Sequence, residues 1–271
     1  MNNTKKKSPI SWVPTAYFAM GLPFVVLNMV TVLMFKGLEV DDKLITFWTS
    51  LILLPWTLKP LWSPFLELFR TKKFFVIVTQ LITGVTFGLV AFALNLSHFF
   101  SISIALLAIV AFSGATHDIA CDGVYMSELS NEDQAKFIGW QGAFYNIAKI
   151  LATGGLVYLA GYFIELNADA GLLTANKRAW MIILLILSVT MILLGIYHLF
   201  ALPSTQSASS KKTLRSNKEV MKELGQVLMD FFRKTHITYY ICFIILYRFA
   251  EGFVMKIVPL FLKADREMGG C

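Results

Sequence analysis

The chain has 271 residues, of which 56% are hydrophobic and only 15% are charged, and its mean hydropathy is +0.65. Soluble domains carry roughly a quarter charged residues, so this composition excludes an ordinary soluble fold and predicts an integral membrane protein. The net charge of +7 would suggest nucleic acid in a soluble protein, but here the basic residues gather in short connections, as membrane topology requires. We therefore expect a lipid bilayer as partner, and no nucleic acid.

Apolar segments recur along the chain, and each is long enough to cross a hydrocarbon layer of about 30 Å. In chain order, we expect seven spans, at 11–36, 44–66, 74–95, 100–126, 137–164, 179–201 and 237–262. The N-terminus and the even-numbered connections are richer in Lys and Arg than the odd-numbered ones. This distribution predicts a multi-pass protein with its N-terminus in the cytoplasm.

The sixth connection, at 202–236, is the one long loop between predicted spans. Ser216 and Glu219 have the spacing of a capping box, which is typical of a helix start. Apolar residues follow at helical spacing: Val220, Leu224, Val227, Leu228 and Phe231. The pattern predicts an amphipathic helix, which lies either on the inner membrane surface or on the protein's own cytoplasmic face.

Six spans, a long basic loop and a further span are the layout of the major facilitator fold. The expected fold is thus an all-α integral membrane protein with a six-helix N-terminal bundle at 1–201 and a cytoplasmic loop at 202–236. The segment 237–271 is expected to be the first helix of a second bundle whose remainder is missing. Because the chain stops soon after the seventh span, we interpret it as a truncated chain or a gene fragment.

The ionisable residues inside the spans are the most informative about function, because each costs about 2.5–3.5 kcal/mol at the centre of a membrane helix. Asp118 and Asp122 are four residues apart, so they share a face of the fourth span. Each carboxylate favours protonation of the other, which suits a proton-coupled carrier. The alternative is a structural pair at the membrane interface, neutralised by Lys59 or Lys149.

Two lysines are candidates for binding a substrate. Lys59 lies between two prolines of the second span and is expected to meet an anionic substrate or the aspartates. Its alternative role is to extend towards the inner membrane surface. Lys149 has Tyr145 and Asn146 one turn earlier, a combination that suits sugar or carboxylate binding; the alternative is a buried lysine paired with an aspartate.

The seventh span carries Arg248 and Glu251, three residues apart, which are expected either to pair or to form part of a hinge with Gly252. No nucleophile triad, phosphate loop or metal-binding spacing occurs in the sequence, and cysteines and histidines are scattered. We therefore expect no catalytic residues, cofactor or metal site. His117 is expected to be a core or cavity residue.

The segment Ala115-Thr116-His117-Asp118-Ile119-Ala120-Cys121-Asp122 resembles the motif of the muropeptide permeases, the AmpG family of the major facilitator superfamily. The run from Leu54 to Pro64, with the sequence LPWTLKPLWSP, is similar to the second helix of that family, and Gly21-Leu22-Pro23 resembles its first-helix signature. Glu67 before a basic turn that begins at Arg70 resembles the superfamily's cytoplasmic gating motif, in a degenerate form.

The resemblance covers nearly the whole chain, but only the front part of a family member. It implies proton-driven import of muropeptides, the N-acetylglucosamine–anhydro-N-acetylmuramic acid peptides, across the bacterial inner membrane for cell-wall recycling. Asp118 would carry the proton with Asp122 as its partner. Acetyl-CoA transporters look similar in this region, so a carrier of acetyl-CoA or a sugar is an alternative. A non-transporting remnant is another.

Overall fold

The structure is a computed structural model that describes residues 7–63, 66, 71–203, 229 and 233–262. Every regular element in these ranges is helical, which confirms the predicted all-α class. The chain separates into two units, 1–205 and 206–271, and each is described by itself. The specific arrangement of the major facilitator fold stays a prediction.

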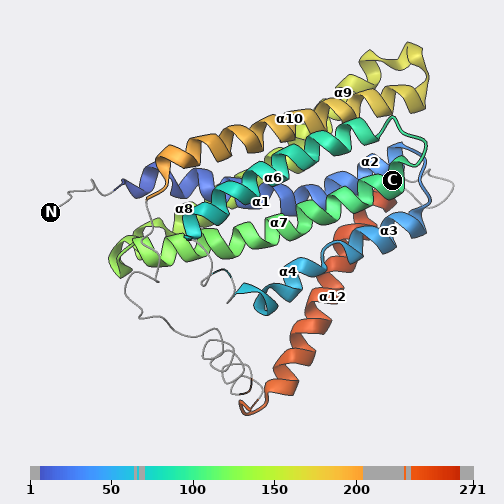
Figure 1. Cartoon of the computed structure of the whole chain (residues 1–271). Coiled ribbons are helices and arrows are strands. Elements are labelled where there is room, and N and C mark those ends of the chain that lie inside the picture. Colours follow the sequence, from blue (N-terminus) through green and yellow to red (C-terminus); the bar gives the residue numbers. More distant parts are fainter. Residues whose placement is uncertain (1–6, 64–65, 67–70, 204–228, 230–232, 263–271) are drawn as a thin grey trace. The chain divides into compact units, whose positions relative to one another are not determined.

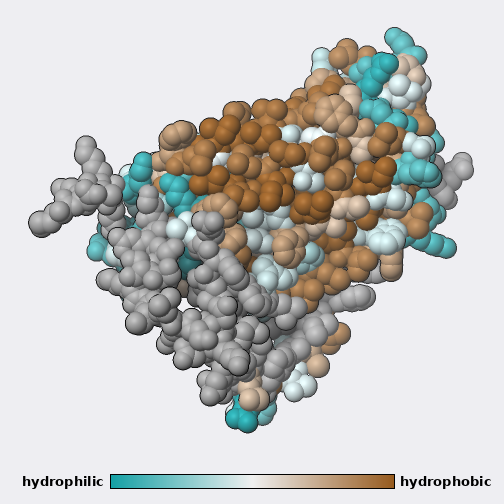
Figure 2. Space-filling model, viewed as in Figure 1, coloured by the Kyte–Doolittle hydropathy of each residue, from teal (hydrophilic) through white to brown (hydrophobic). Residues whose placement is uncertain are grey.

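Within the described residues, five helical segments are long and apolar enough to cross a membrane. They are Pro9–Gly37, Lys72–Ala93, Phe99–Glu128, Asn131–Leu166 and Leu172–Ala201, which correspond to the predicted first, third, fourth, fifth and sixth spans. From Lys72–Ala93 onward, successive segments run in opposite directions, and Pro9–Gly37 runs in the same direction as Lys72–Ala93 (Figure 1). Figure 2 shows apolar residues in a continuous band over α10 and α6, with hydrophilic residues at the ends of these helices. The protein is therefore a membrane protein, as predicted.

Two of the five segments are not uniform α-helices. The first consists of the 3₁₀ turn η1 (Pro9–Ser11), α1 (Val13–Val25), the π-helical segment η2 (Val26–Val30) and α2 (Thr31–Gly37). The fourth consists of α8 (Asn131–Ile150), the π-helical segment η4 (Leu151–Leu156) and α9 (Val157–Leu166). The other three are α6 (Lys72–Ala93), α7 (Phe99–Glu128) and α10 (Leu172–Ala201), the last preceded by the 3₁₀ turn η5 (Ala168–Ala170).

The predicted second span, 44–66, is not one continuous helix in the part of it that the structure describes. It contains α3 (Asp42–Leu51), α4 (Leu54–Leu58) and the 3₁₀ turn η3 (Lys59–Leu61). Pro55 and Pro60 lack the backbone N–H that an uninterrupted helix needs, and each lies in the first turn of a new element, where no N–H is required. The prolines thus divide this segment into short pieces.

In the second unit, α12 (Ile237–Leu262) is helical over the range predicted for the seventh span. Whether it crosses the bilayer stays a prediction. The amphipathic helix predicted around Ser216 and Glu219 lies outside the described residues.

Several helices begin where the sequence supplies a capping side chain. Asp41 accepts hydrogen bonds from the backbone N–H groups of Lys43 (2.9 Å) and Leu44 (3.3 Å) at the start of α3. Thr71 and Ser130 do the same at the starts of α6 and α8. These caps pair N–H groups that the first turn of a helix leaves without partners.

Close contact between α6 and α10 depends on glycine. A Cβ atom on Gly84 would lie 2.7 Å from Cγ1 of Ile192, so a larger residue would force the helices apart. Such small residues allow membrane helices to approach and gain dispersion contacts where no hydrophobic effect drives them together.

A chain of buried hydrogen bonds joins four helices of the bundle. The side-chain amide of Gln80 on α6 donates to Nε2 of His117 on α7 (3.0 Å), and its carbonyl oxygen accepts from Nδ1 of His198 on α10 (2.9 Å). Nε2 of His198 is hydrogen-bonded in turn to the hydroxyl of Thr15 on α1 (2.9 Å). His117 is thus a core residue, as expected, and the network fixes the depth and rotation of these helices against one another.

The N-terminal end of the first span and the start of α6 lie at the C-terminal end of α10. The Lys7 ammonium donates to the carbonyl of Phe200 (2.6 Å), and the Lys73 ammonium donates to the carbonyl of Leu202 (2.8 Å). Lysines at a helix C-terminus pair with its last carbonyl groups and favour its negative dipole end. The basic N-terminus and two connections predicted to be basic, the second and the sixth, therefore adjoin the same side of the bundle.

Candidate functional site

The centre of the candidate site is an ion pair between two predicted site residues on different helical segments. The Lys59 ammonium lies 2.6 Å from Oδ2 of Asp118, which joins the start of η3 to α7. Only 11% of the Asp118 side chain and 28% of the Lys59 side chain are exposed. The sequence left three roles open for Lys59: contact with a substrate, contact with an aspartate, or extension towards the membrane surface. The structure shows Lys59 in contact with an aspartate.

Trp56 is a further member of this site that the sequence analysis missed. Its indole N–H donates to the same carboxylate oxygen of Asp118 at 2.9 Å, and its ring packs edge-to-face against Phe24 at 5.3 Å between centroids. A Cβ on Gly114 would lie only 2.9 Å from the indole ring, so the glycine makes room for it. The signal in the sequence is Gly114 four residues before Asp118, which leaves a recess beside the carboxylate on one helix face.

The second oxygen of Asp118, Oδ1, is buried and has no hydrogen-bond partner among the described residues. A buried carboxylate normally pairs both oxygens, because an unpaired polar atom in an apolar environment costs about 1–3 kcal/mol. Lys59 and Trp56 thus hold one oxygen, and the other is the oxygen at which a proton can be added.

Asp122 lies one turn beyond Asp118 on α7, as predicted, but it is exposed and has different partners. The Tyr17 hydroxyl donates to Oδ1 of Asp122 at 2.8 Å, and the side-chain amide of Gln141 donates to the Tyr17 oxygen at 2.8 Å. Tyr17 therefore connects α7 to α8 through α1. Tyr17 and Gln141 were not predicted, because no local pattern indicates which side chain crosses between helices.

The α8 residues predicted to bind substrate form a separate group. The Lys149 ammonium lies over the Tyr145 ring, 5.5 Å from its centroid, and Asn146 donates to the carbonyl of Gly142 at 2.8 Å. Lys149 makes no ion pair with a carboxylate in the described part of the chain, so the alternative of a lysine paired with an aspartate is not what the structure has. Asn146 is exposed and Lys149 is half-buried.

The α8 group is held against α1 by a close helix contact. A Cβ on Gly21 would lie 2.9 Å from the Tyr145 carbonyl oxygen and 3.0 Å from Cβ of Ala148. The glycine therefore lets the backbones of α1 and α8 approach. This contact sets the position of Tyr145, on whose ring the Lys149 ammonium rests.

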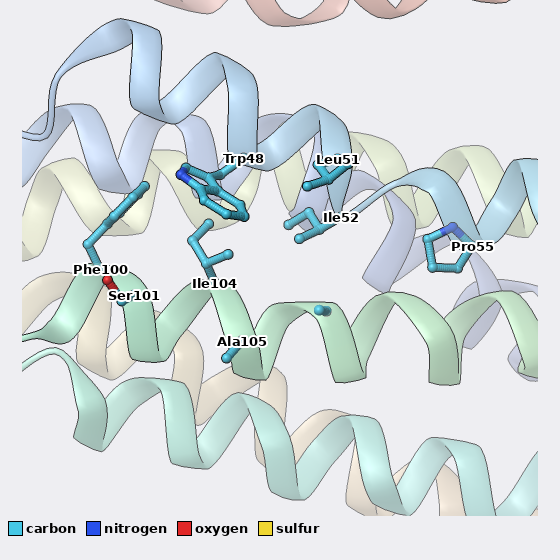
Figure 3. Close-up of a pocket in the computed structure, with 9 residues that line it drawn as sticks. Trp48, Leu51, Ile52, Pro55, Phe100, Ser101, Ile104 and Ala105 are labelled. Carbon is cyan, nitrogen blue, oxygen red and sulfur yellow. The ribbon is translucent and has the colours of Figure 1, made fainter.

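An apolar groove of about 540 Å³ lies between α3, α4 and α7 (Figure 3). Trp48, Leu51, Ile52 and Pro55 line one side, and α7 supplies Phe100, Ser101, Ile104, Ala105 and Ala108. Helical periodicity places Ile104 and Asp118 on nearly the same face of α7, about 21 Å apart along its axis. The groove and the ion pair therefore share one side of α7, and Pro55 of the groove directly precedes Trp56 of the site.

The remaining predicted residues cannot be placed in the site. Glu67 and Arg70 lie outside the described residues. Arg248 and Glu251 lie on α12 in the second unit, and their side chains are outside the described part. Among the described residues, no group of three His, Cys, Asp or Glu side chains could hold a metal ion.

No known protein-family profile matches the chain, and no curated protein sequence matches it. The resemblance to muropeptide permeases stays a hypothesis that rests on the motifs quoted above.

Proposed function

We propose that the protein is a proton-coupled secondary transporter that imports muropeptides across the bacterial inner membrane. The observation that carries the proposal is the ion pair between Lys59 and Asp118, held by Trp56 inside the membrane-spanning unit. Charged side chains at membrane depth are costly and mark proton and substrate paths. The local sequence around Asp118 and Asp122 is the part that resembles the muropeptide permeases.

Proton and solute binding are linked through Lys59 in this proposal. A proton added to Oδ1 of Asp118 removes the negative charge that attracts the Lys59 ammonium at 2.6 Å. The partly exposed ammonium then binds a carboxylate of the solute. Because each event favours the other, the pair couples the proton gradient to solute movement, and the linkage is reciprocal.

The α8 group supplies the second half of the solute site in this proposal. Lys149 and Asn146 offer a cation and an amide, and the Tyr145 ring offers an apolar face. Peptide carboxylates and N-acetyl sugars need these groups: a cation for charge, an amide for hydroxyl or acetamido groups, and an aromatic face for the sugar ring.

The test is uptake of labelled anhydro-disaccharide peptide by proteoliposomes that contain the protein, with and without an inward proton gradient. We expect gradient-driven uptake that a protonophore abolishes and that unlabelled muropeptide reduces more strongly than acetyl-CoA or free sugar. Asp118→Asn should abolish gradient-driven uptake. Asp169→Asn, at an exposed position in η5, is the matched control and should behave as the parent protein.

Two results would contradict the proposal. Gradient-driven uptake that survives Asp118→Asn would remove the proton role of this carboxylate. Uptake that acetyl-CoA competes with better than muropeptide would keep the transporter but change its solute.

A further inference from the structure

The membrane-crossing segments Pro9–Gly37 and Asn131–Leu166 each change from α-helix to π-helix part of the way along, at η2 and η4. π-Helical turns are rare, well below 1% of residues, and they are frequently found at functional sites. Here two of them lie in the two segments that carry Tyr17, Gln141, Tyr145 and Lys149.

The two π-helical segments pack against each other. On one side of them, α1 and α8 form the close contact at Gly21. On the other side, α2 packs against α3 and α10, and α9 packs against α10. The packing partners of both segments therefore change at η2 and η4. Before these points α1 and α8 pack against each other, and after them α2 and α9 pack against other helices.

Features of the sequence make the regular helical backbone less stable at or near both η2 and η4. Pro23, three residues before η2, has no N–H, so the helix loses a hydrogen bond there. The buried side chain of Asn28 within η2 donates to the Phe24 carbonyl at 2.9 Å, and a side chain thus serves a backbone group. In η4, the pair Gly154-Gly155 adds backbone freedom.

Packing does not explain the two glycines. A Cβ on Gly154 would meet nothing within 4 Å, and one on Gly155 would meet only Cδ2 of Leu151, at 3.8 Å. Gly21 and Gly84, by contrast, would bring a Cβ within 2.9 Å and 2.7 Å of a neighbour. We therefore attribute the presence of Gly154 and Gly155 in η4 to the conformational freedom that glycine gives the backbone.

We propose that η2 and η4 form a paired hinge, at which α2 and α9 bend relative to α1 and α8 and so open and close one side of the solute site. This inference rests on the proposed transport function for its biological meaning. Tyr17 lies on α1, and the predicted solute-binding side chains lie on α8. In this proposal these side chains keep their mutual positions while α2 and α9 move.

The test combines glycine substitutions with a measurement of bending. The double variant Gly154→Ala/Gly155→Ala has room for both methyl groups and favours the regular α-helix. We expect higher thermal stability and uptake slowed roughly tenfold, since the hinge closes less readily. Gly161→Ala in α9 is the matched control: its Cβ also meets nothing within 4 Å, and it should raise stability without slowing uptake.

Bending is measured directly by electron-spin distances between labels at Ile138 on α8 and Leu166 at the end of α9, both exposed, in a background in which the native cysteines are replaced by serine. The parent protein should give two distance populations whose ratio changes between acidic and neutral pH, and the glycine double variant should give one. A single narrow distance in the parent under both conditions overturns the hinge, whatever the uptake shows. If the parent bends but takes up no muropeptide, the hinge stands and the proposed function fails.

Discussion

The ion pair between Lys59 and Asp118 makes a quantitative prediction for Lys59→Met. Methionine keeps most of the apolar stem but leaves the Asp118 carboxylate, whose side chain is only 11% exposed, with the Trp56 N–H as its one partner in the described part of the chain. Removing one partner of a buried pair costs about 3–5 kcal/mol. Because 28% of the Lys59 side chain is exposed, water screens part of the loss, and we expect about 3 kcal/mol, the lower end of that range.

The assay is a double-mutant cycle on the free energy of unfolding, measured by reversible denaturation in mixed micelles. Lys59→Met and Asp118→Asn should each destabilise the protein. The double variant should recover much of the loss, because neither charge is then left alone, which gives a coupling energy of at least 1 kcal/mol. Uptake should be lost in all three variants. The double variant regains stability, but it still lacks the two charged side chains that the proposed coupling needs.

The control for this cycle is the exposed pair of Lys136 and Glu132, 2.8 Å apart, whose side chains are 61% and 79% exposed. Its coupling energy should be about 0.3–0.5 kcal/mol, as for solvent-exposed pairs one helix turn apart. If the coupling between Lys59 and Asp118 is no larger than this control value, the reasoning from burial is refuted.

Two further predictions concern neutral side chains that hold the site and the bundle. Trp56→Phe keeps an aromatic ring but removes the N–H that reaches the buried aspartate, so the free energy of unfolding should fall by about 1.5–3 kcal/mol. Trp180→Phe, whose N–H has no partner among the described residues, should change it much less, and equal losses would argue against the hydrogen bond. Gln80→Leu removes the amide that joins two buried histidines, and the thermal unfolding temperature should fall; an unchanged temperature would mean that this hydrogen-bond chain contributes no stability.

The helices were predictable from the sequence because apolar length is a local property. Five of the seven predicted spans coincide with helical segments able to cross a bilayer. The predicted ends agree within two residues except at Asn131 and Leu172, where the helices begin six and seven residues before the predicted starts. The second predicted span is divided into short elements, because Pro55 and Pro60 each begin a new one, and hydropathy alone does not register this division. The chain signals this interruption through its prolines and not through its apolar content.

The site was predictable only in part. Its charged members were found because ionisable residues are rare and costly at membrane depth. Which of them meet was not determined: the sequence allowed Lys59 or Lys149 to face the aspartates, and the structure pairs Lys59 with Asp118 and places Lys149 over Tyr145. Such pairings depend on how deep each helix sits and how it is rotated, and local spacing fixes neither.

The hydrogen-bond chain through Gln80 has a consequence for biosynthesis. Its members enter the bilayer at different times, because Thr15, Gln80 and His117 lie on segments that precede α10, the segment of His198, in the chain. Until α10 is inserted, the carbonyl oxygen of Gln80 lacks the imidazole that pairs with it, and the earlier helices carry an incomplete polar contact in hydrocarbon. Insertion of α10 thus completes this hydrogen-bond network, and a nascent chain that stops short of α10 should be a preferred substrate for membrane proteases.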